Sequence, residues 1–216
     1  MDQLLTVLVV GLLLGGIYGL ISIGLNLIFG VIRIVNFAQG ELVMLGMYGT
    51  YFVYNGIGLD PYLAIFIVAP ALFVIGIAIQ RFVMQPLQTE PMMQIFASFG
   101  LLILFQNIVL AGTRGEALSV RTSYSGTVLE AGDIKIGLSR LLVFVAASLI
   151  TVFMGIYLKR TMVGKSIRAV IQDRQSARLM GINVERTYIV TFGVGAALAG
   201  LAGAMLAPIY TLTPSI

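Results

Sequence analysis

The sequence contains no cysteine, no histidine and few charged residues, and each absence removes a class of chemistry. Without cysteine the chain forms neither a disulfide nor a thiolate metal site. Without histidine it lacks the side chain that most often acts as a general base or a metal ligand near neutral pH. No nucleophile–base pair or metal-ligand cluster remains, so an enzyme is the least favoured class and no metal site is expected.

Charged residues make up 10% of the chain, and hydrophobic residues make up 59%. A soluble domain is only about half apolar, so lipid must surround part of this chain. The net charge of +4 is explained by membrane topology, and we expect no nucleic-acid partner. The N-terminus, MDQLL, has no positive region, and the apolar run after it is too long for a signal peptide. We interpret this run as a retained span.

Continuous apolar runs predict an all-α polytopic membrane bundle, since strands of a membrane barrel would alternate in polarity over about ten residues. We expect residues 1–216 to form a single transmembrane domain. Six segments approach the length needed to span a bilayer: Leu4–Phe29, Ala38–Tyr54, Tyr62–Gln80, Met93–Ala111, Leu141–Leu158 and Tyr188–Pro208.

The basic residues divide unequally between the two sides that these spans define. One side carries Arg114, Arg121, Lys135 and Arg140. The other carries Arg33, Arg81, Lys159, Arg160, Lys165, Arg168, Arg174, Arg178 and Arg186. The positive-inside rule places this second set in the cytoplasm and the N-terminus outside.

The long external loop covers residues 112–140. Its segment TVLEAGDIKI predicts a short β-hairpin, with Ala-Gly-Asp as the turn. The loop is either a solvated connector or a docking surface for an external partner, and the sequence leaves both open.

Two ladders of small residues predict close helix packing, because a spacing of four lines them along one helix face. The first is Gly11, Gly15 and Gly19. The second is Gly195, Ala199, Gly203 and Ala207.

One apparent nucleotide-binding motif fails on its spacing. Gly164, Lys165 and Ser166 match the end of a phosphate-binding loop, but Lys159 stands where the first glycine belongs, and an apolar span precedes it instead of a strand. We therefore expect no ATP site in this chain.

Polar residues interrupt the apolar run GLNLIFGVIRIVNFAQGELVML, from Gly24 to Leu45. This pattern favours a broken or re-entrant helix that lines a cavity, with Asn36, Gln39 and Glu41 near the path of a transported solute. Glu41 at mid-depth would cost roughly 2.5–3.5 kcal/mol, so it needs a partner, and Arg33 is the nearest in sequence. An ordinary cytoplasmic turn is the alternative.

Charge is concentrated in VGKSIRAVIQDRQSARLMGIN, from Val163 to Asn183. Ile167, Val170 and Ile171 form a short apolar stripe at helical spacing. Arg174 and Arg178 lie one turn apart and would repel unless something negative faces them. Gly181 and Asn183 are residues that end helices. We interpret the segment, within a cytoplasmic loop of about residues 159–187, as an amphipathic helix that docks on another protein.

The segment QSARLMG, from Gln175 to Gly181, is similar to the E-A-A-x-x-x-G core of the cytoplasmic loop of bacterial ABC-importer permeases. Ala177 and Gly181 match that core, whereas Gln175 and Ser176 depart from it. With GLNLIFGVIRIVNFAQGELVMLG near the start, the chain resembles branched-chain amino acid permeases of the LivH type along its whole length.

The resemblance implies a coupling helix that sits in a cleft of a separate ATPase subunit. Ile167, Val170 and Ile171 would pack into that cleft or brace the helix against the bundle, while Arg168, Arg174 and Arg178 would pair with ATPase carboxylates. Lys165 lies on the same segment.

The implied partners are a second related permease, two ATPases, a periplasmic substrate-binding protein and the bacterial inner membrane. ATP and Mg²⁺ would be bound by the ATPases, and this chain would bind no cofactor. Members of the family usually have further spans after the position where this chain ends.

Three alternatives stay open. Related permeases carry urea, short amides or other amino acids, and no residue here selects among these substrates. A secondary transporter working alone is a different class, and it would leave the docking helix unexplained. A membrane enzyme is the third.

Overall fold

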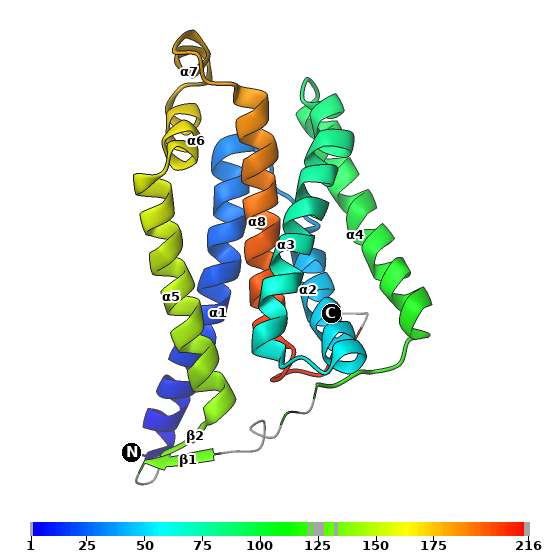
Figure 1. Cartoon of the computed structure of the whole chain (residues 1–216), viewed down its shortest axis with the longest axis vertical. Helices are drawn as coiled ribbons and strands as arrows, with labels where there is room; N and C mark the ends of the chain where they lie inside the picture. The colour runs from blue at the N-terminus through cyan, green and yellow to red at the C-terminus, as the bar shows by residue number, and fades with distance from the viewer. Residues whose placement is uncertain (1, 121, 123–127, 132–133, 214–216) are drawn as a thin grey trace.

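The computed structural model describes the whole chain except residues 1, 121, 123–127, 132–133 and 214–216. Its long helices run side by side as a bundle (Figure 1). The helices are α1 (Asp2–Ile32), α2 (Gln39–Ile57), α3 (Pro61–Ile79), α4 (Pro91–Thr113), α5 (Leu138–Arg160), α6 (Met162–Gln172), α7 (Arg174–Leu179) and α8 (Val184–Leu206). A π-helix, Gln80–Met84, and a 3₁₀ turn, Gln85–Leu87, extend α3.

Five helical segments in the described part of the chain are long and apolar enough to cross a membrane. They are Thr6–Ile32, Pro61–Leu87, Pro91–Thr113, Leu138–Arg160 and Val184–Leu206. The prediction of an all-α polytopic membrane protein is therefore confirmed. The remaining predicted span, Ala38–Tyr54, is the helix α2, but its composition is too polar to meet the same standard.

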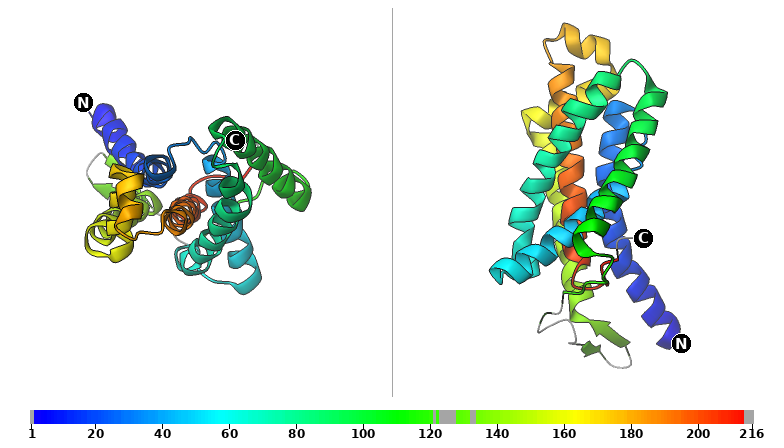
Figure 2. Two further views of the ribbon diagram at one scale, coloured as in Figure 1. Left: turned by 90° about the horizontal axis from the view of Figure 1, so that it is seen from above. Right: turned by 90° about the vertical axis from the view of Figure 1, so that its right-hand side faces the viewer.

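The last helix, α8, is the centre of the bundle, and Figure 2 shows it between the α1–α5 pair and the α2–α3–α4 group. Small residues allow this position, because each leaves room for a side chain or backbone of a neighbouring helix. A Cβ added to Gly195 would lie 2.6 Å from Ile28, and one added to Gly203 would meet the Val43 carbonyl oxygen. Ala199 is fully buried. These three residues of the second ladder therefore lie at close contacts inside the bundle.

The first ladder does not pack within the chain. Gly11, Gly15 and Gly19 are exposed, and a Cβ added to any of them would meet nothing within 4 Å. The side of α1 that faces the bundle instead carries Gly16, against Phe144 of α5, and the buried Ile17. Within this chain the ladder therefore marks an open side of α1.

Most of the predicted cytoplasmic set of basic residues lies at the end of the bundle where α1 and α5 finish and α8 starts, at the top of Figure 1. The N-terminus and the hairpin lie at the opposite end. Strand β1 (Val128–Ala131) pairs antiparallel with β2 (Ile134–Gly137), which confirms the predicted hairpin. Its turn residues Gly132 and Asp133 lie outside the described residues.

Candidate functional site

The chain is not helical where it passes from α1 into α2, within the polar part of the Gly24–Leu45 run, and we call this stretch the interruption. Helix α1 ends at Ile32, and Arg33 then takes a left-handed backbone conformation with φ 64° that an ordinary helix cannot continue through. Residues 33–38 are not helical, and α2 begins at Gln39. Two side chains replace helical hydrogen bonds here: Asn36 Oδ1 accepts from the Ala38 N–H at 3.2 Å, and Ser98 Oγ accepts from the Phe37 N–H at 3.3 Å.

The break lies deep in the bundle. Gln39 Nε2 is 3.5 Å from the carbonyl oxygen of Gly195, which is in the middle of α8. Helix α8 is a candidate membrane span, and Gly195 lies near its middle. The first residue of α2 therefore lies near the middle of the membrane-spanning part of the bundle (Figure 1). Asn36, Gln39 and Glu41 are all buried there, at 4%, 4% and 8% exposure.

Glu41 is held by α4 and not by Arg33. Its Oε1 accepts from Gln106 Nε2 at 2.9 Å, and no cation lies within salt-bridge distance of it among the described residues. Arg33 is exposed and belongs to a different cavity. The predicted Arg33–Glu41 pair is therefore wrong, because the turn after Ile32 carries Arg33 away from the carboxylate.

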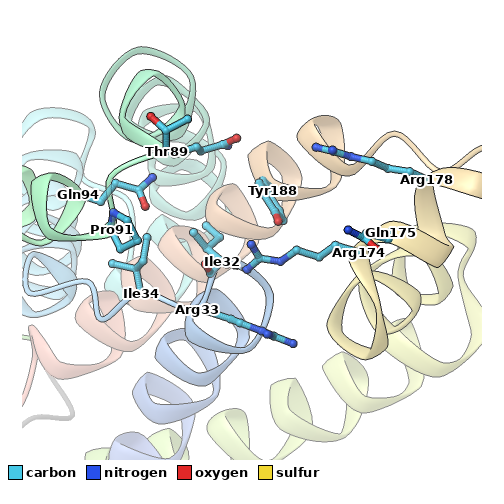
Figure 3. Close-up of a pocket in the computed structure, with 11 residues that line it drawn as sticks. Ile32, Arg33, Ile34, Thr89, Pro91, Gln94, Arg174, Gln175, Arg178 and Tyr188 are labelled. Atoms are coloured by element: carbon cyan, nitrogen blue, oxygen red, sulfur yellow. Dashed lines mark hydrogen bonds between the residues drawn. The ribbon is translucent and has the colours of Figure 1, made fainter.

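The first residues of the interruption line one cavity, and the first turn of α2 after it lines another. The basic cavity, of about 460 Å³, is lined by Ile32, Arg33, Gln94, Arg174, Arg178 and Tyr188 among others (Figure 3). The apolar cavity, of about 470 Å³, is lined mainly by α1, α2 and the end of α8, and it includes Glu41. In sequence Phe37 stands between the residues that line the two cavities, and its ring stacks on that of Phe99 with centroids 4.2 Å apart.

The charged segment between α5 and α8 forms two short helices instead of the single helix that the sequence predicts. Asp173 separates α6 from α7 and caps α7, since its Oδ1 accepts from the Gln175 N–H at 2.8 Å. Hydrogen bonds from the Ser176 hydroxyl and from the backbone N–H groups of Gln175 and Ser176 hold the pKa of the Asp173 carboxyl below its ordinary value. An aspartate that accepts these bonds favours the start of a new helix over continuation of the old one.

The apolar stripe on α6 faces the bundle. Ile167, Val170 and Ala177 are buried in the main core cluster, whereas Ile171 is partly exposed beside Gly30. Of the two roles that the sequence left open, Ile167 and Val170 therefore take the bracing one. Lys165 is exposed. Gly164 packs on the Leu158 backbone at the end of α5, which accounts for this glycine without a phosphate.

Arg174 is engaged inside the chain, which differs from the predicted pairing with a partner's carboxylates. Its Nη2 donates to the carbonyl oxygens of Val31 and Ile32 at 3.1 and 3.0 Å, at the end of α1. Its guanidinium carbon also lies 5.4 Å from the centre of the Tyr188 ring. Figure 3 shows the two side chains at the same cavity. Arg168 donates to the Lys159 carbonyl oxygen at 3.3 Å, and Arg178 is exposed. Arg174 thus joins the charged segment to the last turn of α1, directly before the interruption.

The tip of α7 carries two exposed apolar residues that the sequence interpretation did not select. Leu179 and Met180 are 88% and 82% exposed. Gly181 ends the helix with φ 82°, as predicted, whereas Asn183 begins α8 by accepting from the Arg186 N–H at 2.9 Å. Their position in the sequence, directly before the glycine that ends the helix, could have indicated that they lie exposed at the helix end.

These features define a polytopic helical membrane protein with an interruption between α1 and α2, two cavities next to it and a braced helical pair at one end. No group of metal-ligating residues occurs in the described ranges. The family model for the branched-chain amino acid transport system / permease component matches residues 7–216, and the chain belongs to this family.

Named relatives align with more than nine tenths of this chain but with only about two thirds to three quarters of their own length. The permease protein BraD of the high-affinity branched-chain amino acid transport system of Pseudomonas aeruginosa is 29% identical over 97% of this chain and 73% of its own length. The corresponding permease protein LivH of Escherichia coli is 27% identical over 93% of this chain and 69% of its own length. A probable branched-chain amino acid permease LivH of Methanocaldococcus jannaschii is 27% identical over 91% of this chain and 64% of its own length. No solved structure is significantly similar to the chain.

Proposed function

We propose that this chain is the membrane permease subunit of an importer that carries branched-chain amino acids into the cytoplasm and is driven by ATP hydrolysis in separate subunits. Membership of the permease family supports this role and the substrate class. The observation that carries the proposal is the interruption: non-helical backbone at membrane depth is tolerated only where protein buries it or where it lines a cavity. Here its first residues line one cavity, and the helix turn that follows it lines another.

The path for the solute runs along the face formed by α1, α2 and α4. It passes from the apolar cavity across the Phe37–Phe99 pair to the basic cavity. Asn36, Gln39 and Glu41 belong to this path or to its immediate support. A second permease subunit covers the face, since so many apolar side chains on it, Phe37 and Phe99 among them, are exposed in the single chain.

The α6–α7 pair transmits the conformational change of an ATPase to the path. Leu179, Met180 and Arg178 form the contact with the ATPase, because they are exposed at the tip of α7. Arg174 passes the movement to α1, since it grips the last turn before the interruption. ATP and Mg²⁺ are bound by the ATPases, and this chain has no catalytic step of its own.

The chain lies in the cytoplasmic membrane with α7 in the cytoplasm and the N-terminus outside. The unequal distribution of basic residues supports this orientation. A periplasmic binding protein delivers the solute at the end that carries the hairpin.

The test is uptake of labelled leucine by cells that express this chain with the permease, ATPase and binding-protein genes beside its own. We expect uptake that excess isoleucine or valine abolishes and that excess urea leaves unchanged. Uptake of urea instead of leucine would refute the substrate class. Leucine uptake that continues without the ATPase genes would favour a transporter working alone.

A further inference from the structure

The apolar cavity contains an uncompensated carboxylate close to the start of a helix. Glu41 is 8% exposed and lines the cavity, and its one hydrogen-bond partner in the described chain is the neutral amide of Gln106. A buried carboxylate without a cation is costly in a membrane, so such residues mark substrate or ion pathways. The site therefore calls for a cation that the chain itself does not supply.

The start of α2, within one helical turn of the Glu41 carboxylate, offers partial positive charge from its backbone N–H groups. No side chain caps the start of α2, and the backbone N–H groups of Gly40 and Glu41 make no hydrogen bond among the described residues. Gly40 and Glu41 both line the cavity, and a Cβ placed on Gly40 would meet nothing within 4 Å, so there is open space beside these N–H groups. Free N–H groups at the start of a helix attract a carboxylate.

The rest of the wall is apolar. Ile21, Val43, Met44, Met47 and Leu206 line it, and Tyr18 stands at its exposed side. A volume of about 470 Å³ is in the range of small-molecule sites.

We propose that this cavity is a binding site within the membrane for the zwitterionic head and aliphatic side chain of a branched-chain amino acid. The Glu41 carboxylate accepts hydrogen bonds from the α-ammonium group. The N–H groups of Gly40 and Glu41 donate to the α-carboxylate, and the methionine and valine side chains contact the aliphatic part. The inference rests on the proposed function, which says only that such amino acids cross the bundle. It adds the site at which they bind on the way and the groups that bind them.

The first experiment measures leucine uptake into vesicles that contain the assembled transporter with its binding protein. In Glu41→Gln the amide oxygen still accepts from Gln106 but the charge is gone, so we expect the uptake rate at low leucine concentration to fall at least about tenfold, as loss of one charged hydrogen bond predicts. Gly40→Ala places a methyl group in the open space of the cavity beside the N–H groups, and we expect a similar fall with the fold intact. Glu116→Gln, at an exposed glutamate outside the cavity, is the matched control and should transport as the parent does.

A second experiment detects binding without transport. The chain has no cysteine, so Tyr18→Cys introduces a single thiol at the cavity and Val7→Cys a single thiol on the exposed surface of the same helix. Leucine should slow the reaction of a thiol reagent at position 18 by several-fold and leave position 7 unchanged, and 4-methylpentanoate, which lacks the ammonium group, should not protect.

Parent-level uptake by both Glu41→Gln and Gly40→Ala, or equal protection by leucine and 4-methylpentanoate, would overturn the assignment while leaving the proposed function in place. If the parent transporter carries no branched-chain amino acid, the proposed function fails first. If Glu41→Gln does not assemble, Gly40→Ala and the thiol protection decide the question.

Discussion

Replacing Arg174 by alanine should loosen the charged segment from the rest of the bundle. The Arg174 guanidinium donates to two carbonyl oxygens at the end of α1, at 3.1 and 3.0 Å, and lies over the Tyr188 ring. A hydrogen bond from a charged donor contributes about 1.5–3 kcal/mol. Both hydrogen bonds come from the same nitrogen, Nη2, of a half-buried side chain. We therefore expect the two bonds and the contact with the Tyr188 ring to stabilise the closed position of α7 by about 2 kcal/mol in total.

Loss of this stabilisation in Arg174→Ala should raise the equilibrium constant for opening of α7 roughly 30-fold. Hydrogen exchange read by mass spectrometry on a peptide covering residues 174–183 measures it, since the Ala177 and Ile182 amides are protected by bonds to Asp173 and Ala177. The matched control is Arg178→Ala, which removes the same charge from an exposed side chain with no hydrogen bond in the described chain. The amides of this peptide should exchange faster in Arg174→Ala than in the parent protein. In Arg178→Ala they should exchange at the parent rate. Equal rates in all three proteins would refute the bracing role of Arg174.

Three further predictions concern other parts of the same structure. Leu179→Asp should abolish co-purification of the ATPase and leave the amount of permease in the membrane unchanged, because an 88% exposed side chain contributes nothing to the core; retention of the ATPase on affinity resin would contradict this. Gly195→Val should lower the free energy of unfolding in detergent by about 1–3 kcal/mol, since its Cβ would lie 2.6 Å from Ile28, whereas Gly15→Ala should change it little. Because the pKa of Asp173 is lowered in the folded chain, its contribution to α7 is complete above the ordinary aspartate pKa and is lost as the pH falls through the lower folded value. The chain has no tryptophan, so fluorescence of Met180→Trp should report an acid transition of α7 that disappears in the Asp173→Asn background.

The fold could be predicted from the sequence where the signal is local. Continuous apolar runs located the spans, and the polar residues between Asn36 and Glu41 located the interruption, since such residues are costly within an unbroken membrane helix. Regular spacing predicted the packing of Gly195 and Gly203 against α1 and α2. The same spacing misled at Gly11, Gly15 and Gly19, because periodicity specifies a face of a helix but not what covers it.

Contacts between distant segments could not be predicted. The partner of Glu41 is Gln106, on α4, and sequence proximity had suggested Arg33. Arg174 was expected to face outward because its spacing from Arg178 implies repulsion, but the free carbonyl groups at the end of α1 provide a partner within the chain. The division of the charged segment into α6 and α7 depends on Asp173, whose capping role competes with the helical stripe around it.

The most direct test of the account is whether ATP hydrolysis in partner subunits drives the solute through this chain. The measurement is accumulation of labelled leucine in vesicles that contain the purified transporter and its binding protein, with ATP or a non-hydrolysable analogue supplied on the α7 side, and with an ionophore present to remove ion gradients. We expect accumulation with ATP alone, and we expect Leu179→Asp to abolish it. Accumulation that needs an ion gradient and ignores ATP would contradict it.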